Sequence, residues 1–341
     1  MRIVVDVSPL SHPRTGVGNY IRGSLLGLAA TPHEVVAFAP VTATGRRAVE
    51  EALAGIDVEL HLPTLPAAHA VRTAWSRIGR PAAERFLGRF DVLHFSDWMY
   101  PPQRDGLRST MVHDLVPLHH PEWVHRRTER MHGAKYAHAA RTCDVIVANS
   151  CFTADDVAAT LGFPRERVRV AYPVVDPVFT PDGPRADGEY VLTVGTLEPR
   201  KNLALAIDGV RGRELRVVGA RGWGGVEASG EHVTWLGPLD DAELARQYRG
   251  ASVVVYPSRF EGFGMPIVEA MACGAPVVAS SHPSLDEASG DVALRAGDPD
   301  QVAVAIDEAI SRRSELTARG IEHARRFSAE ANALAHLDAW S

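Results

Sequence analysis

The chain has 341 residues, 45% of them hydrophobic, which is ample material for one large or two medium-sized cores. Its net charge of −6 is unevenly divided: residues 1–180 contain 20 Lys and Arg against 18 Asp and Glu, whereas residues 181–341 contain 16 against 24. Neither half has the strongly basic balance that broad nucleic-acid binding requires, so we expect no nucleic-acid partner.

Cysteine usage and hydropathy indicate a cytoplasmic protein. Cys143, Cys151 and Cys273 form no Cys-x-x-Cys pair, which favours a reduced setting. Met1 is followed directly by strand-like residues, so we expect no signal peptide. No apolar run approaches the ~20 residues that a spanning helix requires.

The first half alternates between apolar strands and helices. Residues 2–7 read as a buried strand, and the loop 9–18 leads into a helix over about 17–30. Further strand and helix candidates follow at 35–39, 46–53, 58–62, 71–87, 92–95, 110–112, 126–141, 145–148 and 168–172. This alternation predicts a parallel sheet with crossover helices.

The loop before the first helix contains Gly16 and Gly18, which raises the alternative of a dinucleotide site. Two features count against it. The third glycine position holds Ile21, and the second strand, 34–39, ends without the acidic residue that would bind a ribose. An ordinary tight turn between a strand and a helix is the other alternative.

The segment 72–90 is unusually basic. It holds five arginines against one acid, Glu84, and aromatic residues lie between them. Such a helix is a candidate for peripheral contact with an anionic membrane surface, at the inner face of the membrane for a cytoplasmic protein. Pro81 interrupts the segment, and a solvated helix face is the alternative.

The histidines of the first half invite a metal hypothesis, but their spacing does not support one. No pair has the helical i, i+4 arrangement around a glutamate, and no common zinc pattern matches. We therefore expect no metal site. The histidines considered are His119, His120, His125, His132 and His138.

Prolines between 173 and 184 mark a linker, which predicts domains at 1–176 and 177–326 and a closing helix at 327–341. Strands are expected at 190–194, 215–218, 233–236, 253–256 and 277–279. Arg200 and Lys201 follow the first of these strands, where cations are well placed to neutralise an anion. Thr196 and Gly219 lie in the turns after the first and second strands.

The stretch from Tyr256 to Ser280 carries the strongest signal. A buried strand is followed by a loop with Gly262 and Gly264, and a helix begins near Pro266. Free backbone amides and the positive helix end suit a phosphate there. Glu261 precedes the loop and Glu269 lies in the helix, so the pattern suggests a ligand with phosphates in the middle and sugars at both ends.

Glu261, seven intervening residues and Glu269, in a Glu-Gly-Phe-Gly-Met-Pro setting, resemble the signature of the glycosyltransferase family 4 (group 1) enzymes. The resemblance extends over nearly the whole chain and is strongest over 190–295. It implies the α/β GT-B fold: two Rossmann-like β/α/β domains with parallel sheets facing a cleft, and a C-terminal helix that crosses back to the first domain. It also implies retaining, metal-independent transfer of a hexose without a cofactor, from a nucleotide-sugar donor to a saccharide, lipid-linked or small-molecule acceptor.

The resemblance assigns roles to individual residues. It places Glu261 and His113 at the donor sugar and Glu269 at the ribose, and Asp114 beside His113 could fix the imidazole tautomer. Asp97, Trp98 and Tyr100 are candidates for the acceptor pocket. The diphosphate is expected to contact cations, backbone amides and glycine loops, namely Lys201, Arg200, Gly262, Phe263, Gly264, Met265, Gly16 and Gly18.

The match is incomplete at one position, and the donor stays open. Thr196 stands where relatives often have an arginine, and Arg200 is the candidate to compensate. Gly219 is a candidate for the region of the base. The glycine loop and the loop 195–202 resemble those of mannosyltransferases and related hexosyltransferases of polysaccharide assembly. This resemblance favours GDP-mannose as the donor slightly over UDP- or dTDP-sugars. The alternatives are a non-transferring GT-B enzyme, such as a sugar-nucleotide epimerase or a phosphorylase, and an inactive sugar-nucleotide-binding module.

Overall fold

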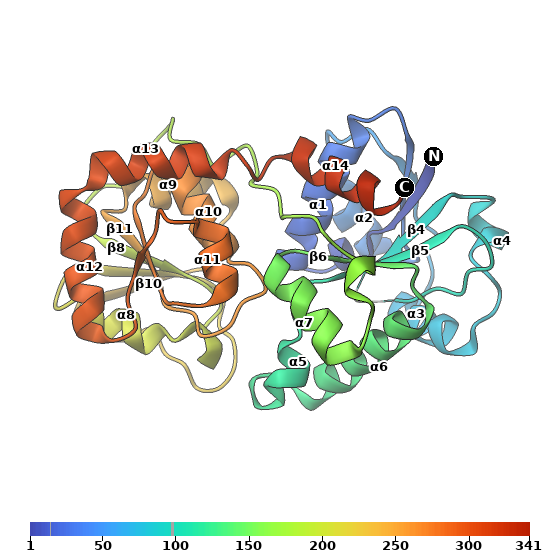
Figure 1. Ribbon diagram of the computed structural model, residues 1–341, viewed down its shortest axis with the longest axis horizontal. Coiled ribbons are helices and arrows are strands. Elements are labelled where there is room, and N and C mark those ends of the chain that lie inside the picture. Colours follow the sequence, from blue (N-terminus) through green and yellow to red (C-terminus); the bar gives the residue numbers. More distant parts are fainter. Residues whose placement is uncertain (14, 97–98) are drawn as a thin grey trace. The chain divides into compact units, whose positions relative to one another are not determined.

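The computed structural model describes residues 1–13, 15–96 and 99–341. These residues form two compact units (Figure 1). Unit 1 comprises residues 1–174 together with 328–341, and unit 2 comprises residues 175–327. Each unit is a parallel sheet with helices on both faces, as the alternating pattern of strands and helices predicts.

Within the described part of unit 1, seven parallel strands form one sheet in the order β3-β2-β1-β4-β5-β6-β7. The strands are β1 (Arg2–Asp6), β2 (Glu34–Phe38), β3 (Glu59–His61), β4 (Val92–Phe95), β5 (Leu107–Val112), β6 (Val145–Ala148) and β7 (Val168–Val170). The helices are α1 (Gly16–Ala29), α2 (Ala43–Ala52), α3 (Ala68–Ile78), α4 (Glu84–Leu87), α5 (Val116–His119), α6 (Arg126–Thr142), α7 (Cys151–Leu161) and α14 (Ala329–Ala339). Short 3-10 turns are η1 (Ser8–Ser11), η2 (Pro121–Trp123) and η3 (Arg165–Arg167).

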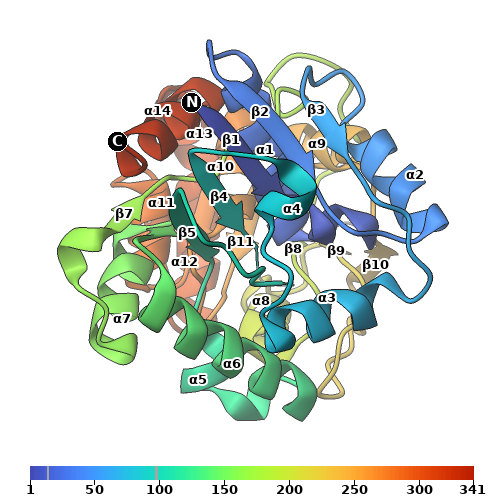
Figure 2. The ribbon, with the colours of Figure 1, turned by 90° about the vertical axis from the view of Figure 1, so that its right-hand side faces the viewer.

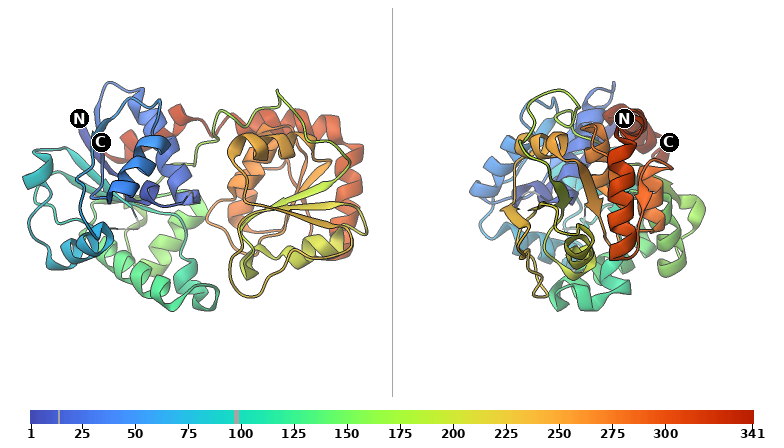
Figure 3. Two further views of the ribbon diagram at one scale, coloured as in Figure 1. Left: turned by 180° about the vertical axis from the view of Figure 1, so that it is seen from behind. Right: turned by 90° about the vertical axis from the view of Figure 1, so that its left-hand side faces the viewer.

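Unit 2 has a six-stranded parallel sheet in the order β10-β9-β8-β11-β12-β13. Helices pack around the strands of this unit (Figure 3). Its strands are β8 (Val191–Val194), β9 (Leu215–Val218), β10 (Val233–Gly237), β11 (Val253–Tyr256), β12 (Val277–Ala279) and β13 (Leu294–Arg295). Its helices are α8 (Leu203–Gly209), α9 (Asp241–Gly250), α10 (Met265–Ala272), α11 (Pro283–Ser289), α12 (Pro299–Ser311) and α13 (Arg313–Ala324), with the 3-10 turn η4 (Pro199–Lys201).

The strand order places a topological switch point in each sheet. In unit 1 the chain reverses direction across the sheet between β1 and β4, and in unit 2 between β8 and β11. In open parallel sheets, ligands bind beyond the carboxyl ends of the strands at such points, because the following loops diverge there. The loops after β8 and β11 are therefore the first place to look for a site in unit 2.

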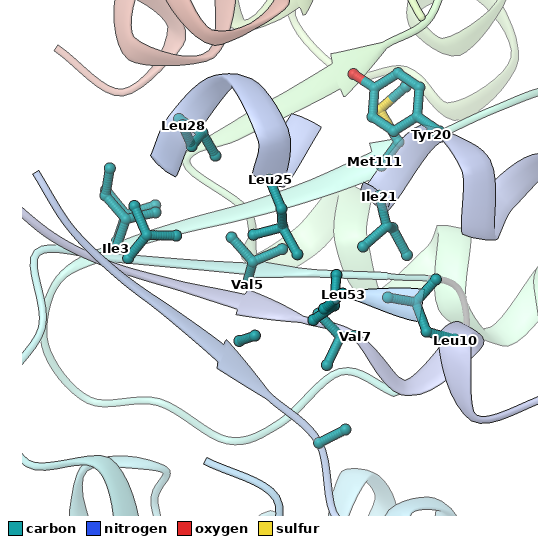
Figure 4. Packing of buried hydrophobic residues seen from close by; sticks show 14 of the residues in the cluster. Ile3, Val5, Val7, Leu10, Tyr20, Ile21, Leu25, Leu28, Leu53 and Met111 are labelled. Atoms are coloured by element: carbon teal, nitrogen blue, oxygen red, sulfur yellow. The ribbon is translucent and has the colours of Figure 1, made fainter. Parts of the chain in front are cut away.

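The core of unit 1 follows from alternation along β1. Ile3 and Val5 point to the face covered by α1, where they pack with Leu25 and Leu28 (Figure 4). Val4 faces the opposite side, in a separate cluster that contains Trp75 of α3. Both faces of the sheet are therefore buried, which explains why the strands read as continuous apolar runs.

The C-terminal helix α14 packs in unit 1 beside α1, which confirms the predicted return to the first domain (Figure 1). The two helices approach closely at Gly27 of α1, where a Cβ atom would lie 2.0 Å from the carbonyl oxygen of Ala329. Only a glycine leaves room for this approach.

Buried polar and aromatic groups also connect α14 to the sheet. His336 Nε2 lies 3.3 Å from the Tyr20 hydroxyl, and the His336 ring packs edge-on against His94 of β4. Trp340 donates a hydrogen bond from Nε1 to Ser109 Oγ at 3.0 Å. The end of the chain is thus part of the core of unit 1.

In the basic segment 72–90, the structure corrects one expectation. Arg72 is not on a membrane-facing or solvated helix face, because its side chain is only 2% exposed and its Nη1 donates to the carbonyl oxygen of Pro40 at 3.2 Å. The segment is divided into α3 and α4. Ile78 and Phe86 are exposed beside exposed arginines, so the rest of the segment keeps a basic surface with apolar residues.

Two further features of the described residues concern membranes and metals. No described helix combines the length and apolarity needed to cross a bilayer. Within the same residues, no group of three or more His, Cys, Asp or Glu side chains is arranged to hold a metal ion.

A first prediction concerns the contact between α1 and α14. Gly27→Ala should lower the free energy of unfolding by about 1–3 kcal/mol, because the new methyl group overlaps the backbone of α14. Gly16→Ala is the matched control in the same helix, since a Cβ there meets no atom within 4 Å. Urea unfolding of both variants tests this prediction, and equal midpoints would contradict the close packing.

A second prediction concerns pH. Burial lowers the pKa of His336 from 6.5 to about 4, opposed by its bond to the Asn332 carbonyl. His336 therefore resists protonation in the folded state, so the unfolded state binds more protons between pH 4 and pH 6.5. Stability should fall by up to about 3 kcal/mol as the pH drops from 6.5 towards 4, and it should level off below that.

Thermal unfolding of wild type and His336→Gln across this range checks the expected slope. Burial lowers the pKa of His138 to about 4 as well, so the variant should reduce the pH dependence without removing it. If stability depends on pH equally in the variant and in wild type, His336 is not a source of that dependence.

Candidate active site

The candidate site lies at the switch point of unit 2. The loop after β8 contains η4 with Arg200 and Lys201, and the loop after β11 contains Glu261. The two loops are joined through their backbones, because the Arg259 amide donates to the Arg200 carbonyl at 2.8 Å. Ser258 Oγ lies 3.2 Å from the same carbonyl oxygen. Residues about 60 positions apart in the chain are therefore held as one cluster.

Glu261 is the centre of this cluster. Its side chain is buried, and its Oε1 accepts hydrogen bonds from Lys201 Nζ at 2.5 Å, Ser258 Oγ at 2.5 Å and the Tyr256 hydroxyl at 2.9 Å. Its Oε2 accepts from Arg200 Nη1 at 2.8 Å. Arg200 also pairs through Nε with Glu198 Oε1 at 2.7 Å. Two cations and two carboxylates thus balance each other.

The electrostatics keep Glu261 ionised. Burial alone raises the pKa of its carboxyl, but Arg200 and Lys201 outweigh that effect and lower the pKa to about 2. Burial lowers the pKa of the Lys201 ammonium, opposed by Glu261. Burial raises the pKa of the Tyr256 hydroxyl well above 10, so it acts as a neutral donor. A desolvated carboxylate would be costly without these partners.

The glycine loop and α10 follow directly. Gly264 has φ 113° and directly precedes the first residue of α10. A Cβ atom at Gly264 would lie 2.7 Å from the Leu285 side chain. The phenyl ring of Phe263 is buried edge-on against Phe327, with centroids 5.2 Å apart, so the backbone of this residue is the part that can contact a ligand. Met265, predicted just before the helix, is its first residue.

Glu269 lies in α10 and is 7% exposed. Its Oε2 accepts a hydrogen bond at 3.0 Å from the hydroxyl of Tyr248, a fully buried residue of α9. Burial raises the pKa of that hydroxyl well above 10, so it donates in its neutral form. Tyr248 therefore orients the Glu269 carboxylate.

The turns after β8 and β9 approach each other closely. Gly219 has φ 149°, and a Cβ there would lie 2.0 Å from the carbonyl oxygen of Gly195. Thr196 follows Gly195 and is half-buried, next to a small cavity that Lys201 also lines. The predicted residues Thr196 and Gly219 therefore belong to the same sheet edge as Lys201.

The remaining candidates lie in unit 1. His113 directly follows β5, is half-buried, and packs edge-on against Tyr20 with ring centroids 5.2 Å apart. Asp114 accepts a hydrogen bond from the Val116 amide at 3.1 Å, at the start of α5. Gly16 begins α1, and the Gly18 amide donates to Thr15 Oγ1 at 3.2 Å, which caps that helix. Asp97 and Trp98 lie outside the described residues.

Sequence reasoning missed four residues that support the site: Glu198, Tyr248, Tyr256 and Ser258. Tyr256 and Ser258 lie inside the motif string, and their position at the end of a strand was an available signal. Tyr248 is 21 residues from Glu269 in the chain, on another helix, and no local pattern connects the two.

Comparisons with known proteins cover both units. A family model described as "Glycosyltransferase Family 4" matches residues 14–179, and one described as "Glycosyl transferases group 1" matches residues 188–312. An O-antigen chain mannosyltransferase B of Escherichia coli is 29% identical over 276 residues, covering 70% of this chain and 71% of that protein. A D-inositol 3-phosphate glycosyltransferase of Mycolicibacterium smegmatis is 28% identical over 385 residues, covering 95% and 86%.

Among solved structures, Anabaena HepE in complex with UDP-glucose superposes with a TM-score of 0.71 and 17% identity, covering 99% of this chain and 98% of that one. This likeness confirms the predicted GT-B fold. The two family models match both halves of the chain, on either side of the linker, and the second spans the two glutamates of the motif. The chain therefore belongs to the group 1 glycosyl transferases of glycosyltransferase family 4, and it is a glycosyltransferase of the GT-B type.

Proposed function

We propose that this protein transfers a hexose from a nucleotide diphosphate sugar to an acceptor with retention of the anomeric configuration and without a metal ion. The observation that carries the proposal is the buried cluster of Glu261 with Lys201 and Arg200 at the switch point of unit 2. Two cations at the carboxyl edge of a parallel sheet are suited to a diphosphate, and an adjacent carboxylate is suited to sugar hydroxyls.

The donor would bind by exchange of partners. In the cluster Lys201 and Arg200 both donate to Glu261. A diphosphate that takes over part of these bonds would free a carboxylate oxygen of Glu261 for the donor sugar. The amides at the start of α10 would contact the phosphates, and Glu269, oriented by Tyr248, would accept hydrogen bonds from the ribose.

The cations would also assist departure of the leaving group. Negative charge grows on the diphosphate as the glycosidic bond breaks, and side chains that are already in place stabilise it without reorganisation. An oxygen of Glu261 that accepts three hydrogen bonds is a poor nucleophile. We therefore propose same-face attack, in which the departing phosphate oxygen accepts the proton of the acceptor hydroxyl. In this scheme His113, Gly16 and Gly18 of unit 1 contact the donor.

The relatives rank the substrates. The mannosyltransferase from Escherichia coli supports GDP-mannose as the first donor to test, and the complex of HepE with UDP-glucose supports UDP-sugars as the second. The D-inositol 3-phosphate glycosyltransferase supports a phosphorylated small molecule as a further acceptor to test, beside saccharides and lipid-linked acceptors. Release of nucleoside diphosphate from a panel of GDP-, UDP- and dTDP-sugars with these acceptors tests the proposal, and no acceptor-dependent release with any pair would overturn it.

Glu261→Gln separates binding from transfer. The rate of transfer should fall by about two orders of magnitude, as when a positioned polar group is removed from a transition state. The nucleoside diphosphate should bind at least as tightly, because Lys201 and Arg200 lose an anionic competitor. Calorimetry with the nucleoside diphosphate and a turnover assay measure the two effects. Wild-type turnover in this variant would remove Glu261 from the site.

Lys201→Met tests the source of positive charge. The dissociation constant for the nucleoside diphosphate should rise roughly 10- to 100-fold, which corresponds to the loss of one charged hydrogen bond. Arg319→Gln is the control, because that arginine of α13 contacts Asp291 and Glu315 rather than the cluster around Glu261. A chelator should leave wild-type turnover unchanged, and a loss that Mg²⁺ or Mn²⁺ restores would contradict the metal-independent scheme.

A further inference from the structure

Unit 1 contains a second cationic site, distinct from the cluster around Glu261. A cavity of about 430 Å³ opens between α3 and α6, and Tyr100, which follows β4, also lines it. The two helices lie side by side in unit 1 (Figure 2). The volume is within the ~300–1,000 Å³ typical of small-molecule sites.

The lining of the cavity is strongly basic. Arg77 comes from the last turn of α3, and Arg126 and Arg130 come from the first two turns of α6. His69, His125, Thr73 and Ser76 also contribute polar groups, and no acidic side chain lines the cavity among the described residues. The spacing of Arg126 and Arg130 places both on one face of α6, because residues four apart in a helix are neighbours.

Within the described part of the chain, the three arginines also have no partners. Unlike Arg200, none of them forms a hydrogen bond or ion pair with another described residue, and all three are exposed. Like charges around one cavity repel each other, so the arrangement gains nothing for the fold. A bound anion reverses the sign of this interaction, and guanidinium groups bind phosphate oxygens with two parallel hydrogen bonds each.

The cavity is fixed to the same sheet edge as His113. Helix α6 is held at the carboxyl end of β5, since the buried Lys135 ammonium donates to the Met111 carbonyl and the Tyr136 hydroxyl donates to the Asp114 carbonyl at 2.9 Å. The next turn towards the start of this helix carries Arg130. The arginines are thus presented by a rigid helix that also supports the residues around His113.

We propose that this cavity binds the phosphate group of the acceptor, which makes the acceptor an anionic molecule, either a sugar phosphate or a lipid with a phosphate headgroup. The assignment of this phosphate to the acceptor rests on the proposed glycosyl transfer, whereas phosphate binding by the cavity does not depend on it. The donor diphosphate has its own cations, Lys201 and Arg200, in unit 2.

The test uses wild type, the double variant Arg126→Gln with Arg130→Gln, and the control Arg141→Gln, an exposed arginine in the last turn of α6 that does not line the cavity. Two arms are run in parallel. Calorimetry measures binding of glucose 6-phosphate and of glucose, and flotation measures binding to vesicles of phosphatidylglycerol and of phosphatidylcholine.

Wild type and the control should bind glucose 6-phosphate in preference to glucose, and the double variant should lose about 10- to 100-fold in affinity. If only phosphatidylglycerol binding responds to the double variant, the phosphate belongs to a lipid headgroup and the proposal holds. If neither ligand binds, or if the control and the double variant respond alike, the proposal is wrong.

Binding of nucleoside diphosphate to the double variant separates this inference from the proposed function. That binding should be unchanged, because the cations assigned to the diphosphate are Lys201 and Arg200 of unit 2, and Arg126 and Arg130 are not among them. Phosphate binding in the cavity without any sugar transfer would reject the proposed function and keep the anion site. Transfer activity without the cavity's phosphate binding would reject the anion site alone.

Discussion

The ion pairing of Glu261 with Lys201 and Arg200 is the interaction on which the candidate site depends. A carboxylate that is 7% exposed is costly to bury, and its cost is offset only because cations and hydroxyls occupy both of its oxygens. The same contacts hold two loops together that follow different strands. Ligand chemistry and local stability therefore use the same groups, and a ligand that draws the cations away must replace what they provide.

The parallel sheet explains why this cluster can form. Strand order places β8 beside β11, so the loops that carry Lys201 and Glu261 leave the sheet at neighbouring positions. The turns after β8 and β9 can approach each other closely only with a glycine at position 219, because any side chain there would meet the backbone of Gly195. The geometry thus depends on chain topology first, and on a few glycines where backbones come close.

The parts of this arrangement that could be predicted from the sequence are the local ones. The glycine loop, the start of α10 and the two glutamates lie within one short string, so their spacing determines their relation. Tyr248 could not be predicted, because it reaches Glu269 from another helix. Arg72 shows the opposite failure: its neighbours in the sequence indicate a basic surface, yet its guanidinium lies 2% exposed against the Pro40 carbonyl. Direction of a side chain is a tertiary property, and a charge pattern alone does not supply it.

The two units use positive charge in different ways. In unit 2 the cations at the switch point are neutralised by Glu198 and Glu261 and are partly buried, so a phosphate ligand must compete with an internal anion. This competition favours a ligand that offers two phosphates and a sugar to replace the lost bonds. In unit 1 the arginines of the α3–α6 cavity have no such competitor among the described residues, so a single phosphate is sufficient there. Exposed charges are screened by salt, whereas buried pairs are screened much less. Salt should therefore weaken anion binding in unit 1 more than in unit 2. This difference in salt dependence is a physical basis for distinguishing a monophosphate acceptor from a diphosphate donor within one chain.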